Sequence, residues 1–526
     1  MRAAAGRRGG RATGVALAIV APLLAFVALM SWGLSSPVAS SPDDDFHLAS
    51  IWCAAGDEVR TCEPSPTAEN REISEKLLRS HVCFAFYPDA SAACQPGDLS
   101  DVQAPLIDSE RGNFAGLYPP VFYGTMSLFA GDNLETSVLV IRAVNSLLMV
   151  GLMTAVVVVA PRRLRMPAVL GVVGTAVPLA VFIIPSTNPS SWAVISAATL
   201  WPALMTWYAS TGRRRVVSGI LATLAVVMGG GARSDAALFA VLAMVAVVIL
   251  SAERSKRFLI STILPVALTV VAGLFFLSGR QGSQVGSGLP NADGDQRGLR
   301  FLIGENLQQV PSLFAGIFGN GANLGWLDTP VPAATWVLGL SIFFALGFVG
   351  VGVLDRRKTV VVVAAFAALW LVPTVLLVQT RALAGSQVQP RYVLPIAVIL
   401  LGLTLVATRT GRPRLRRGQM VFVIAGLSLA NALALHGNMR RYVTGLDVDG
   451  WNLDSGLEWW WPAAPSPSLV WVAGSAAFTL CLVALAAVLE RATERDVPRP
   501  GDERGHGRDD ASDQDDEWTR PAVNAG

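Results

Sequence analysis

The chain has 526 residues, of which 52% are hydrophobic and 15% charged, and its formal net charge is +3. A soluble globular protein carries roughly 25% charged residues, so this composition excludes a series of soluble domains. It predicts an all-α polytopic membrane protein instead. Arginine supplies almost all of the positive charge, and this bias gives no indication of nucleic-acid binding.

The N-terminal region, residues 1–34, combines an arginine cluster with an apolar run over residues 13–34. A cleaved signal peptide and a retained signal-anchor both begin in this way. The run is long, and residues 37–41 offer only a weak small-residue cleavage site. We therefore expect the first span to be retained.

Eleven further apolar segments follow, and basic clusters occupy every second connection between them. A span needs about 17–25 apolar residues, and basic connections favour the cytoplasm. The pattern predicts about twelve transmembrane helices in a bacterial inner membrane, with both termini cytoplasmic. The expected regions are 1–34 (N-terminus and first span), 35–133 (first extracytoplasmic loop), 134–278 (spans 2–7), 279–332 (extracytoplasmic loop), 333–436 (spans 8–11), 437–467 (Trp-rich extracytoplasmic loop), 468–489 (span 12) and 490–526 (disordered cytoplasmic tail).

Four of the five cysteines, Cys53, Cys62, Cys83 and Cys94, fall in the first large loop. An even set confined to one loop indicates disulfides and an oxidising compartment. The spacing leaves the pairing open, and the simplest prediction joins Cys53 to Cys62 and Cys83 to Cys94. Zinc binding is less favoured because neither pair has the C-x₂₋₄-C spacing.

An acidic cluster, Asp43, Asp44 and Asp45, lies with His47 shortly after the first span. Ionisable groups at the membrane surface of so apolar a chain usually have a function. The structural alternative is a solvated acidic loop that caps a helix. Three adjacent carboxylates could also hold a divalent metal through oxygen ligands, and no other cofactor is indicated.

Further polar residues lie near the predicted outer ends of the spans. Arg391 begins the tenth span and Arg233 follows three glycines, and a guanidinium can bind a phosphate through two parallel hydrogen bonds. Snorkelling or a structural ion pair is the alternative for each. The remaining candidates for lining a substrate site are Tyr118, Asn188, Asp235, Trp326, Asp328, Gln389 and Tyr392. Trp326 and Asp328 could contact a sugar, and a purely structural turn there is the alternative.

These parts fit the chemistry of a polyprenyl-phosphate sugar, whose tail lies in the bilayer and whose sugar phosphate lies at the outer interface. An Asp can accept the proton of the attacking acceptor hydroxyl. A fixed Arg can stabilise the charge of the departing lipid phosphate. We predict Asp43 as the base, Asp44 as its support, His47 as the group that orients the acidic pair, and Arg391 or Arg233 as the phosphate ligand.

The same residues resemble a family of uncharacterised multispanning bacterial membrane proteins (domain of unknown function 2142), placed within the GT-C glycosyltransferase superfamily. Pro42-Asp43-Asp44 with His47 is similar to the family's Pro-Asp-Glu-x-x-His signature, although Asp44 replaces the usual Glu. The other matching segments, in chain order, are Tyr118-Pro119-Pro120, Asn188-Pro189-Ser190-Ser191, Arg233 with Asp235, Gly325-Trp326-Leu327-Asp328 and Arg391-Tyr392-Val393-Leu394-Pro395. The resemblance implies a GT-C-like fold, a catalytic carboxylate in the first loop and a lipid-phosphate sugar donor.

The predicted function is therefore an inverting membrane glycosyltransferase. Its expected partners are a polyprenyl-phosphate sugar donor, an envelope glycan or lipid acceptor, and membrane lipids. The alternatives are a transporter or flippase of a lipid-linked glycan and a non-catalytic scaffold for envelope assembly. Transport favours ionisable residues near the bilayer midplane, whereas the predicted spans are nearly free of them.

Overall fold

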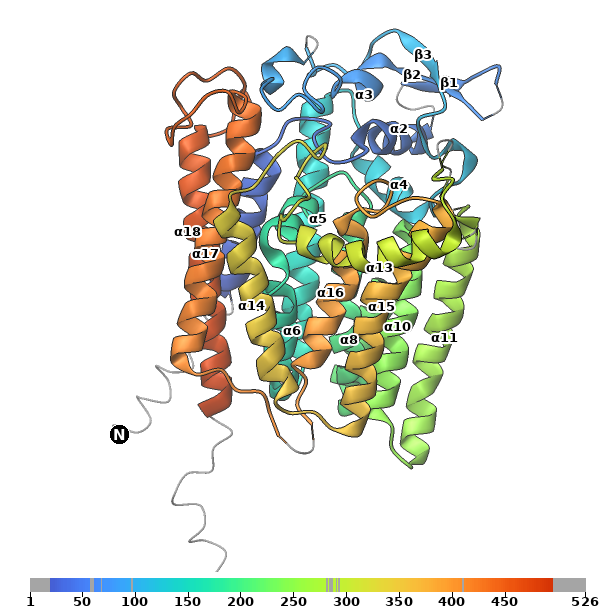
Figure 1. The fold of residues 1–526 in the computed structure, drawn as a ribbon, viewed down its shortest axis with the longest axis vertical. Helices are drawn as coiled ribbons and strands as arrows, with labels where there is room; N and C mark the ends of the chain where they lie inside the picture. Colours follow the sequence, from blue (N-terminus) through green and yellow to red (C-terminus); the bar gives the residue numbers. More distant parts are fainter. Residues whose placement is uncertain are drawn as a thin grey trace, which may run out of the picture.

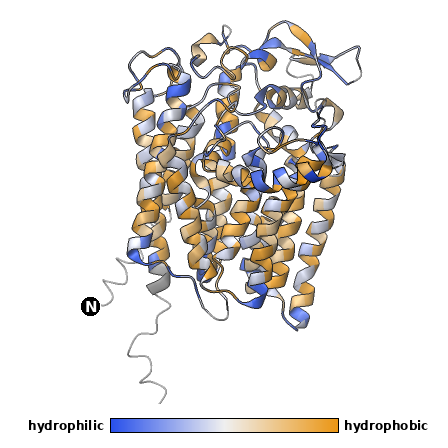
Figure 2. Cartoon of the chain, in the orientation of Figure 1, coloured by the Kyte–Doolittle hydropathy of each residue, from blue (hydrophilic) through white to orange (hydrophobic). Residues whose placement is uncertain are grey.

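The computed structural model describes residues 19–56, 61–67, 69–95, 98–280, 282, 287–289, 291, 294–408 and 411–494. These residues form a bundle of roughly parallel helices with a smaller cap at one end (Figure 1). Figure 2 shows apolar residues along the bundle and hydrophilic residues gathered in the cap and at the opposite end. This distribution is the one expected for a helical bundle surrounded by lipid.

Eight of the described helices are long and apolar enough to cross a membrane. Each keeps its backbone hydrogen bonds within the helix, which is what allows a segment to lie in hydrocarbon. They are α5 (Leu134–Val159), α9 (Gly212–Ala232), α10 (Ser234–Ser251), α11 (Lys256–Ser278), α14 (Ala333–Val351), α15 (Arg356–Thr380), α17 (Arg417–Val443) and α18 (Pro467–Glu494).

The predicted count of about twelve spans is wrong for the described residues, which contain eight candidates, or nine if one bent pair counts as a span. The pair is α6 (Arg162–Val173) followed by η5 (Ala176–Ala180) and α7 (Val181–Ile183), and it bends by 80°. Helix α16 (Pro390–Thr404) has 15 residues, and at 1.5 Å per residue it rises only about 22 Å. The helix Ile19–Leu34 is short as well, although its predicted beginning lies outside the described residues.

The remaining predicted span, α8 (Ser190–Ala209), lies inside the bundle and is not among the candidate spans. Every residue from 190 to 204 in it is buried. Its neighbours are therefore other helices rather than lipid, so serine and threonine are tolerated along its length. Hydropathy alone does not distinguish such an interior helix from one that faces lipid.

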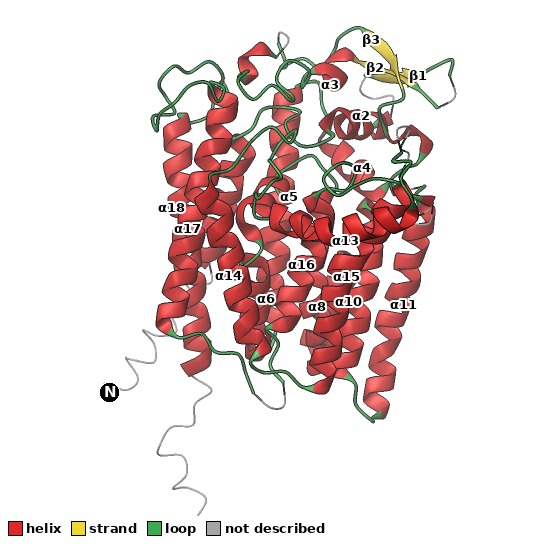
Figure 3. Ribbon diagram, in the orientation of Figure 1, coloured by secondary structure: helices red, strands yellow, loops and turns green. Residues whose placement is uncertain are grey.

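The cap is formed by the described part of residues 35–133, and it is not purely helical. A three-stranded antiparallel sheet contains β1 (Cys62–Pro64), β2 (Arg71–Ser74) and β3 (Leu106–Ser109) in that order (Figure 3). The all-α prediction is corrected to mostly helical on this account. The helical elements of the cap are α2 (Asp44–Ala54), α3 (Glu75–Arg79), η2 (Ala92–Cys94), η3 (Asn113–Ala115), α4 (Val121–Met126) and η4 (Ser127–Phe129).

Both predicted disulfides are confirmed. Cys53–Cys62 ties the end of α2 to the start of β1, and Cys83–Cys94 closes a short loop elsewhere in the cap. A covalent link across a loop removes conformational freedom from the unfolded cap. The Cys53–Cys62 disulfide therefore holds α2, which begins directly after Asp43, against the sheet.

The predicted loop 279–332 contains α13 (Leu299–Gly316), which runs crosswise to the spans (Figure 1). Its buried face includes Leu302, Asn306 and Val310. The Asn306 amide group donates to the carbonyl of Ala382 at 2.9 Å and accepts from the backbone N–H of Ala384 at 2.9 Å. This helix therefore anchors the connection between α15 and α16, which leads to Arg391. The predicted tail beyond residue 494 lies outside the described residues.

Candidate functional site

Asp43 precedes α2 and has a left-handed backbone conformation, with φ 60° and ψ 25°. For a residue other than glycine this conformation costs roughly 1 kcal/mol and is found disproportionately at functional sites. The carbonyl of Asp43 accepts from the backbone N–H groups of Phe46 and His47, both at 3.0 Å. The Asp43 side chain remains 41% exposed. The turn thus presents a reachable carboxylate at the entrance to a helix.

A buried arginine in α5 positions the chain that leads to Asp43. The Arg142 guanidinium donates to the carbonyls of Gly33, Ser36 and Pro37, each at 2.6 Å, and to the hydroxyl of Ser40 at 3.2 Å. Arg142 as a whole is only 1% exposed. These four hydrogen bonds offset part of the cost of burying the charge. Arg142 therefore fixes the path of the backbone between the first helix and the acidic cluster.

Arg391, at the start of α16, forms an ion pair with Asp43 across 348 positions of the sequence. Its Nη2 lies 2.6 Å from Asp43 Oδ2, and its side chain is 4% exposed. Nη1 donates to the Gln389 side chain, and Nη2 also donates to the Tyr392 hydroxyl at 3.2 Å. The arginine is therefore held from the side of α16, and its charge faces the Asp43 carboxylate.

Arg233, between α9 and α10, is held close to the same tyrosine. It donates two hydrogen bonds to the Asp235 carboxylate, at 2.9 and 2.7 Å. The guanidinium carbon lies 4.6 Å from the centre of the Tyr392 ring and 5.6 Å from that of Tyr118. The Arg391 guanidinium carbon is 4.9 Å from the same Tyr392 ring. Two arginines thus contact one aromatic ring.

The charges around Asp43 decide its protonation. Burial by itself opposes ionisation, but the nearby guanidinium of Arg391, with further contributions from His47, Arg111 and Arg233, lowers the pKa of Asp43 below its usual value. A positive charge close to a carboxylate favours the charged form. Asp43 is therefore ionised at neutral pH and can accept a proton or a hydrogen bond.

Asp44 faces the interior rather than the exposed side of the turn. It is fully buried and accepts hydrogen bonds from the Thr187 hydroxyl at 2.6 Å and the Ser41 backbone N–H at 2.9 Å. Burial raises the pKa of Asp44 to about 6, against the opposing effects of the Thr187 hydrogen bond and the Arg142 charge. Asp44 thus supports the turn, and a substrate would have to reach Asp43 instead.

His47 is buried among aromatic rings and does not contact the two carboxylates through a hydrogen bond in the described structure. Its Nδ1 is hydrogen-bonded to the Tyr123 hydroxyl at 2.9 Å, and its ring meets that of Tyr118 edge-on. Burial lowers the pKa of His47 to about 3, so it is neutral at pH 7. The prediction that His47 orients the acidic pair is corrected, because its partner is Tyr123.

The third carboxylate, Asp45, has a partner that the sequence did not indicate. Arg111, in the loop after β3, donates two hydrogen bonds to it at 2.7 and 2.8 Å and also approaches Asp43 Oδ1 at 3.9 Å. The nearest partners of the three adjacent carboxylates are therefore different: Arg391 for Asp43, Thr187 for Asp44 and Arg111 for Asp45. No group of three or more metal-ligating side chains exists among the described residues, so they do not form the predicted metal site.

Two predicted substrate-lining residues attach the loop before α14 to the cap instead. The Asp328 carboxylate accepts from the Arg441 guanidinium at 2.8 Å and from the Phe86 backbone N–H at 3.0 Å. The Trp326 ring stacks on His81 with centroids 4.4 Å apart, and its Nε1 donates to the Ala39 carbonyl at 2.9 Å. Both residues are at least nine-tenths buried, so neither presents a face to a sugar.

Asn188 also has a structural role. It is fully buried, and its amide donates to the Pro42 carbonyl at 2.8 Å.

A cavity of about 20 Å³ lies beside Pro42, Gln389 and Arg391 and has apolar walls that include Phe182 and Leu324. This volume suits about one water molecule. The site is therefore closely packed on the Arg391 side, and Asp43 is approached from its exposed face.

The fold and the site together define a multi-span helical membrane protein whose disulfide-bonded cap holds an arginine-paired carboxylate at one end of the bundle. The family described as "Predicted membrane protein (DUF2142)" matches residues 23–400, and the chain belongs to this family. The matched region includes Asp43, Arg233 and Arg391. No curated protein and no solved structure matches the chain.

Proposed function

We propose that the chain is a GT-C-type inverting glycosyltransferase that transfers a sugar from a polyprenyl-phosphate donor to a cell-envelope glycan or lipid on the extracytoplasmic face. The observation that carries this proposal is the exposed, ionised Asp43 carboxylate beside Arg391, at one end of an apolar bundle. The reactive phosphate of a lipid-linked donor lies at the outer membrane interface, which is where we place this end of the bundle. The resemblance to the GT-C superfamily is an analogy at the level of the fold.

In the proposed reaction, Asp43 accepts the proton of the acceptor hydroxyl as its oxygen attacks the anomeric carbon. The bond between that carbon and the phosphate oxygen breaks, and the polyprenyl phosphate departs with the electron pair. Arg391 stabilises the negative charge on the departing phosphate. Attack from the side opposite the leaving group inverts the configuration of the sugar.

The ion pair between Asp43 and Arg391 suggests how the donor prepares the base. A donor phosphate that binds Arg391 competes with the Asp43 carboxylate for the same guanidinium. Release from this pair raises the pKa of Asp43 towards its usual value and makes it a stronger base when the donor is in place.

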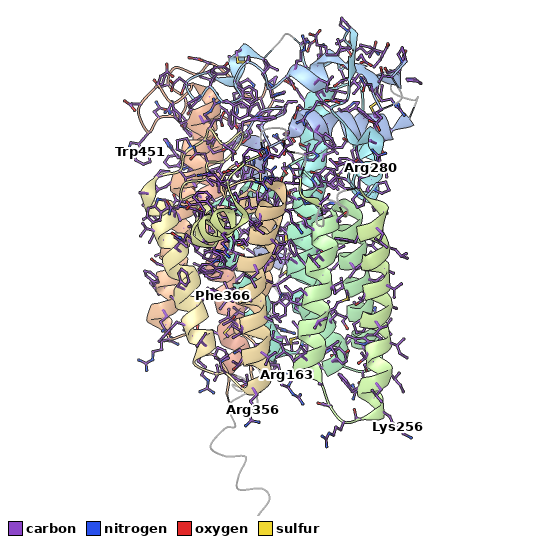
Figure 4. The ribbon with its side chains drawn as sticks, turned by 45° about the vertical axis from the view of Figure 1, so that its right-hand side comes forward. Arg163, Lys256, Arg280, Arg356, Phe366 and Trp451 are labelled. Atoms are coloured by element: carbon purple, nitrogen blue, oxygen red, sulfur yellow. A yellow bond between two sulfur atoms is a disulfide. The ribbon has the colours of Figure 1, made fainter. Side chains whose placement is uncertain are left out.

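The charge distribution supports an extracytoplasmic position for the cap. Basic side chains from the connections of α6, α11 and α15 gather at the end of the bundle opposite the cap, among them Arg163, Arg257 and Arg356 (Figure 4). Arginine-rich connections favour the cytoplasm. The two disulfides of the cap fit an oxidising compartment.

The test is sugar transfer by the purified full-length protein, supplied with a panel of polyprenyl-phosphate sugars and envelope extracts as acceptor. Asp43→Asn keeps the shape of the side chain and removes its basicity, so we expect transfer to fall about 10²–10⁴-fold. Asp449→Asn, an exposed change in the loop after α17, is the matched control and is expected to retain full activity.

Full transfer by folded Asp43→Asn would refute the assignment of the base. Translocation of a fluorescent lipid-linked sugar across vesicles, without any transfer, would instead favour the transporter or flippase. If the wild-type protein neither transfers nor translocates but stays bound to envelope-assembly proteins, the scaffold is favoured.

A further inference from the structure

A second concave site lies at the end of the bundle opposite the cap, and the proposed reaction does not use it. It is a cavity of about 730 Å³ between the ends of α6, α8, α10, α11, α15 and α16. Figure 4 labels Arg163 and Arg356 at this end of the bundle. Small-molecule sites typically occupy 300–1,000 Å³, so the cavity is large enough for a ligand.

The lining of this cavity is strongly basic. The structure places six cationic residues around it and two acidic ones, Glu253 and Asp355. The Asp355 carboxylate also caps α15 by accepting from the Lys358 backbone N–H at 2.9 Å. The cationic residues are Arg163, Arg257, Arg356, Arg357, Lys358 and Arg412. Such an excess of one sign in a concave site concentrates counter-ions there.

Part of this charge has a structural use. The Lys358 ammonium group is fully buried and donates to the carbonyls of Gly350 and Val406, both at 2.9 Å, and so ties α15 to its neighbours. The Arg257 guanidinium donates to the Ser210 carbonyl at 2.7 Å. These two cations shape the walls of the cavity, and neither is hydrogen-bonded to a carboxylate within the described residues.

Arg163 and Arg356 differ from these two. Both are exposed, and neither has a hydrogen bond or an ion pair within the described part of the chain. Topology alone requires basic residues at this end of the bundle, but it does not require them around a cavity. Arg213 and Arg214, in the first turn of α9, serve such a topological role without lining the cavity.

The cavity also has an apolar wall and favourable backbone dipoles. Leu164, Met205 and Phe258 contribute apolar surface beside the arginines. The N-terminal turns of α6, α11 and α15 supply lining residues, and helix N-termini favour anions. We propose that this cavity binds a phosphate-bearing ligand, either the headgroup of an anionic phospholipid or a soluble phosphate compound, with Arg163 and Arg356 as its phosphate ligands.

The test uses native mass spectrometry of the full-length protein in detergent, with phosphatidylglycerol and phosphatidylcholine of identical acyl chains. We expect phosphatidylglycerol to be retained preferentially, because the zwitterionic headgroup adds a positive charge to the site. The double variant Arg163→Gln/Arg356→Gln loses two charge-assisted contacts, and its affinity should fall about 10- to 100-fold. The control Arg213→Gln/Arg214→Gln removes the same charge from the same end of the bundle and should bind like the wild type.

A second arm, calorimetric titration with sodium pyrophosphate, distinguishes the two sources of phosphate. Retention of phosphatidylglycerol that depends on the two arginines identifies a lipid, whereas binding of pyrophosphate alone with the same dependence identifies a soluble ligand. The single variants Arg163→Gln and Arg356→Gln replace the double variant if it does not fold. Binding of neither probe, or equal binding by the cavity and control variants, would overturn the proposal.

Discussion

The two ends of the bundle differ in how their charged side chains are paired and in the space around them. At the cap end of the bundle, the charged side chains around Asp43 and Asp328 form close ion pairs, and the cavity beside Arg391 has a volume of only about 20 Å³. At the opposite end, six cations and two acids line about 730 Å³ of space. The matched pairs are Asp43–Arg391, Asp45–Arg111, Asp235–Arg233 and Asp328–Arg441.

This difference indicates two kinds of site. Charges fixed in advance stabilise a transition state without reorganisation, which suits the chemistry we propose around Asp43. An excess of cationic over acidic side chains around an open cavity suits the binding of a whole anionic group. The comparison predicts that single substitutions in the cap have large effects on reaction and folding, whereas single exposed charges at the opposite end have small ones.

After Asp43→Asn, the largest expected effect is that of Arg391→Gln on sugar transfer. Loss of one group that stabilises developing charge typically costs about 10²–10³-fold in kcat. Because Arg391 counteracts the effect of burial on Asp43, its removal raises the pKa of Asp43. Activity requires the ionised base and is lost as the pH falls through this pKa, so the acid limb of the pH–rate profile should move to higher pH. An acid limb at the wild-type pH together with an unchanged kcat would exclude a role of Arg391 in the reaction.

The next largest effect concerns the buried ion pair between Asp328, in the loop before α14, and Arg441 of α17. In Arg441→Met the buried Asp328 carboxylate loses its partner, and leaving one charge of a buried pair unpaired costs about 3–5 kcal/mol. The exposed pair Arg417–Glu490, at the opposite end, is the matched comparison, since such pairs are worth about 0–1 kcal/mol. Unfolding of Arg441→Met and Arg417→Met in detergent measures both. Equal stability losses would contradict the contrast between the two ends.

Asp44 predicts a specific pH dependence of stability. Burial raises the pKa of its carboxyl from an ordinary 3.8 to about 6 in the folded protein, so the folded state binds the proton more tightly than the unfolded state. The contribution of Asp44 to stability is then greatest below about pH 4 and falls by up to about 3 kcal/mol as the pH rises to about 6. Asp44→Asn should flatten the melting temperature across this window. A variant with the same pH profile as the wild type would exclude Asp44 as its cause.

The smallest expected effect is local to the cap. Replacing Cys53 and Cys62 with Ser removes a link between residues nine positions apart, which is worth roughly 2–3 kcal/mol for a loop of this length. We expect trypsin to cut the cap faster, while the connections at the opposite end are cut at the wild-type rate. Equally faster cutting at both ends would show that the disulfide stabilises the whole bundle.

Much of the site could be predicted from the sequence. Asp43, Arg391 and Arg233 carry charge next to apolar segments, where a charge is costly, and the structure brings all three together around Tyr392. The disulfide pairs were predictable because each joins close neighbours in the chain. In both cases the signal lies in the residues themselves or in their immediate surroundings.

The remaining features depend on contacts that a linear pattern does not contain. In the sequence, Arg111 cannot be told from any other loop arginine. Its contact with Asp45 appears only in the fold, where the loop after β3 lies beside α2. In the sequence, Trp326 resembles an exposed sugar-binding residue, whereas in the structure His81 stacks on its ring. The number of spans was overestimated because a hydropathy run shows neither the 80° bend after Val173 nor that the helical part of the run beginning at residue 391 ends at Thr404.

The central claim is that the end of the bundle bearing Asp43 faces away from the cytoplasm, and sidedness labelling tests it most directly. Asp449→Cys reports on the cap end and Arg213→Cys on the opposite end; both positions are exposed. With a membrane-impermeant maleimide, we predict labelling of Asp449→Cys in intact cells and of Arg213→Cys only after permeabilisation. Labelling of Arg213→Cys in intact cells, with Asp449→Cys protected until permeabilisation, would contradict the account.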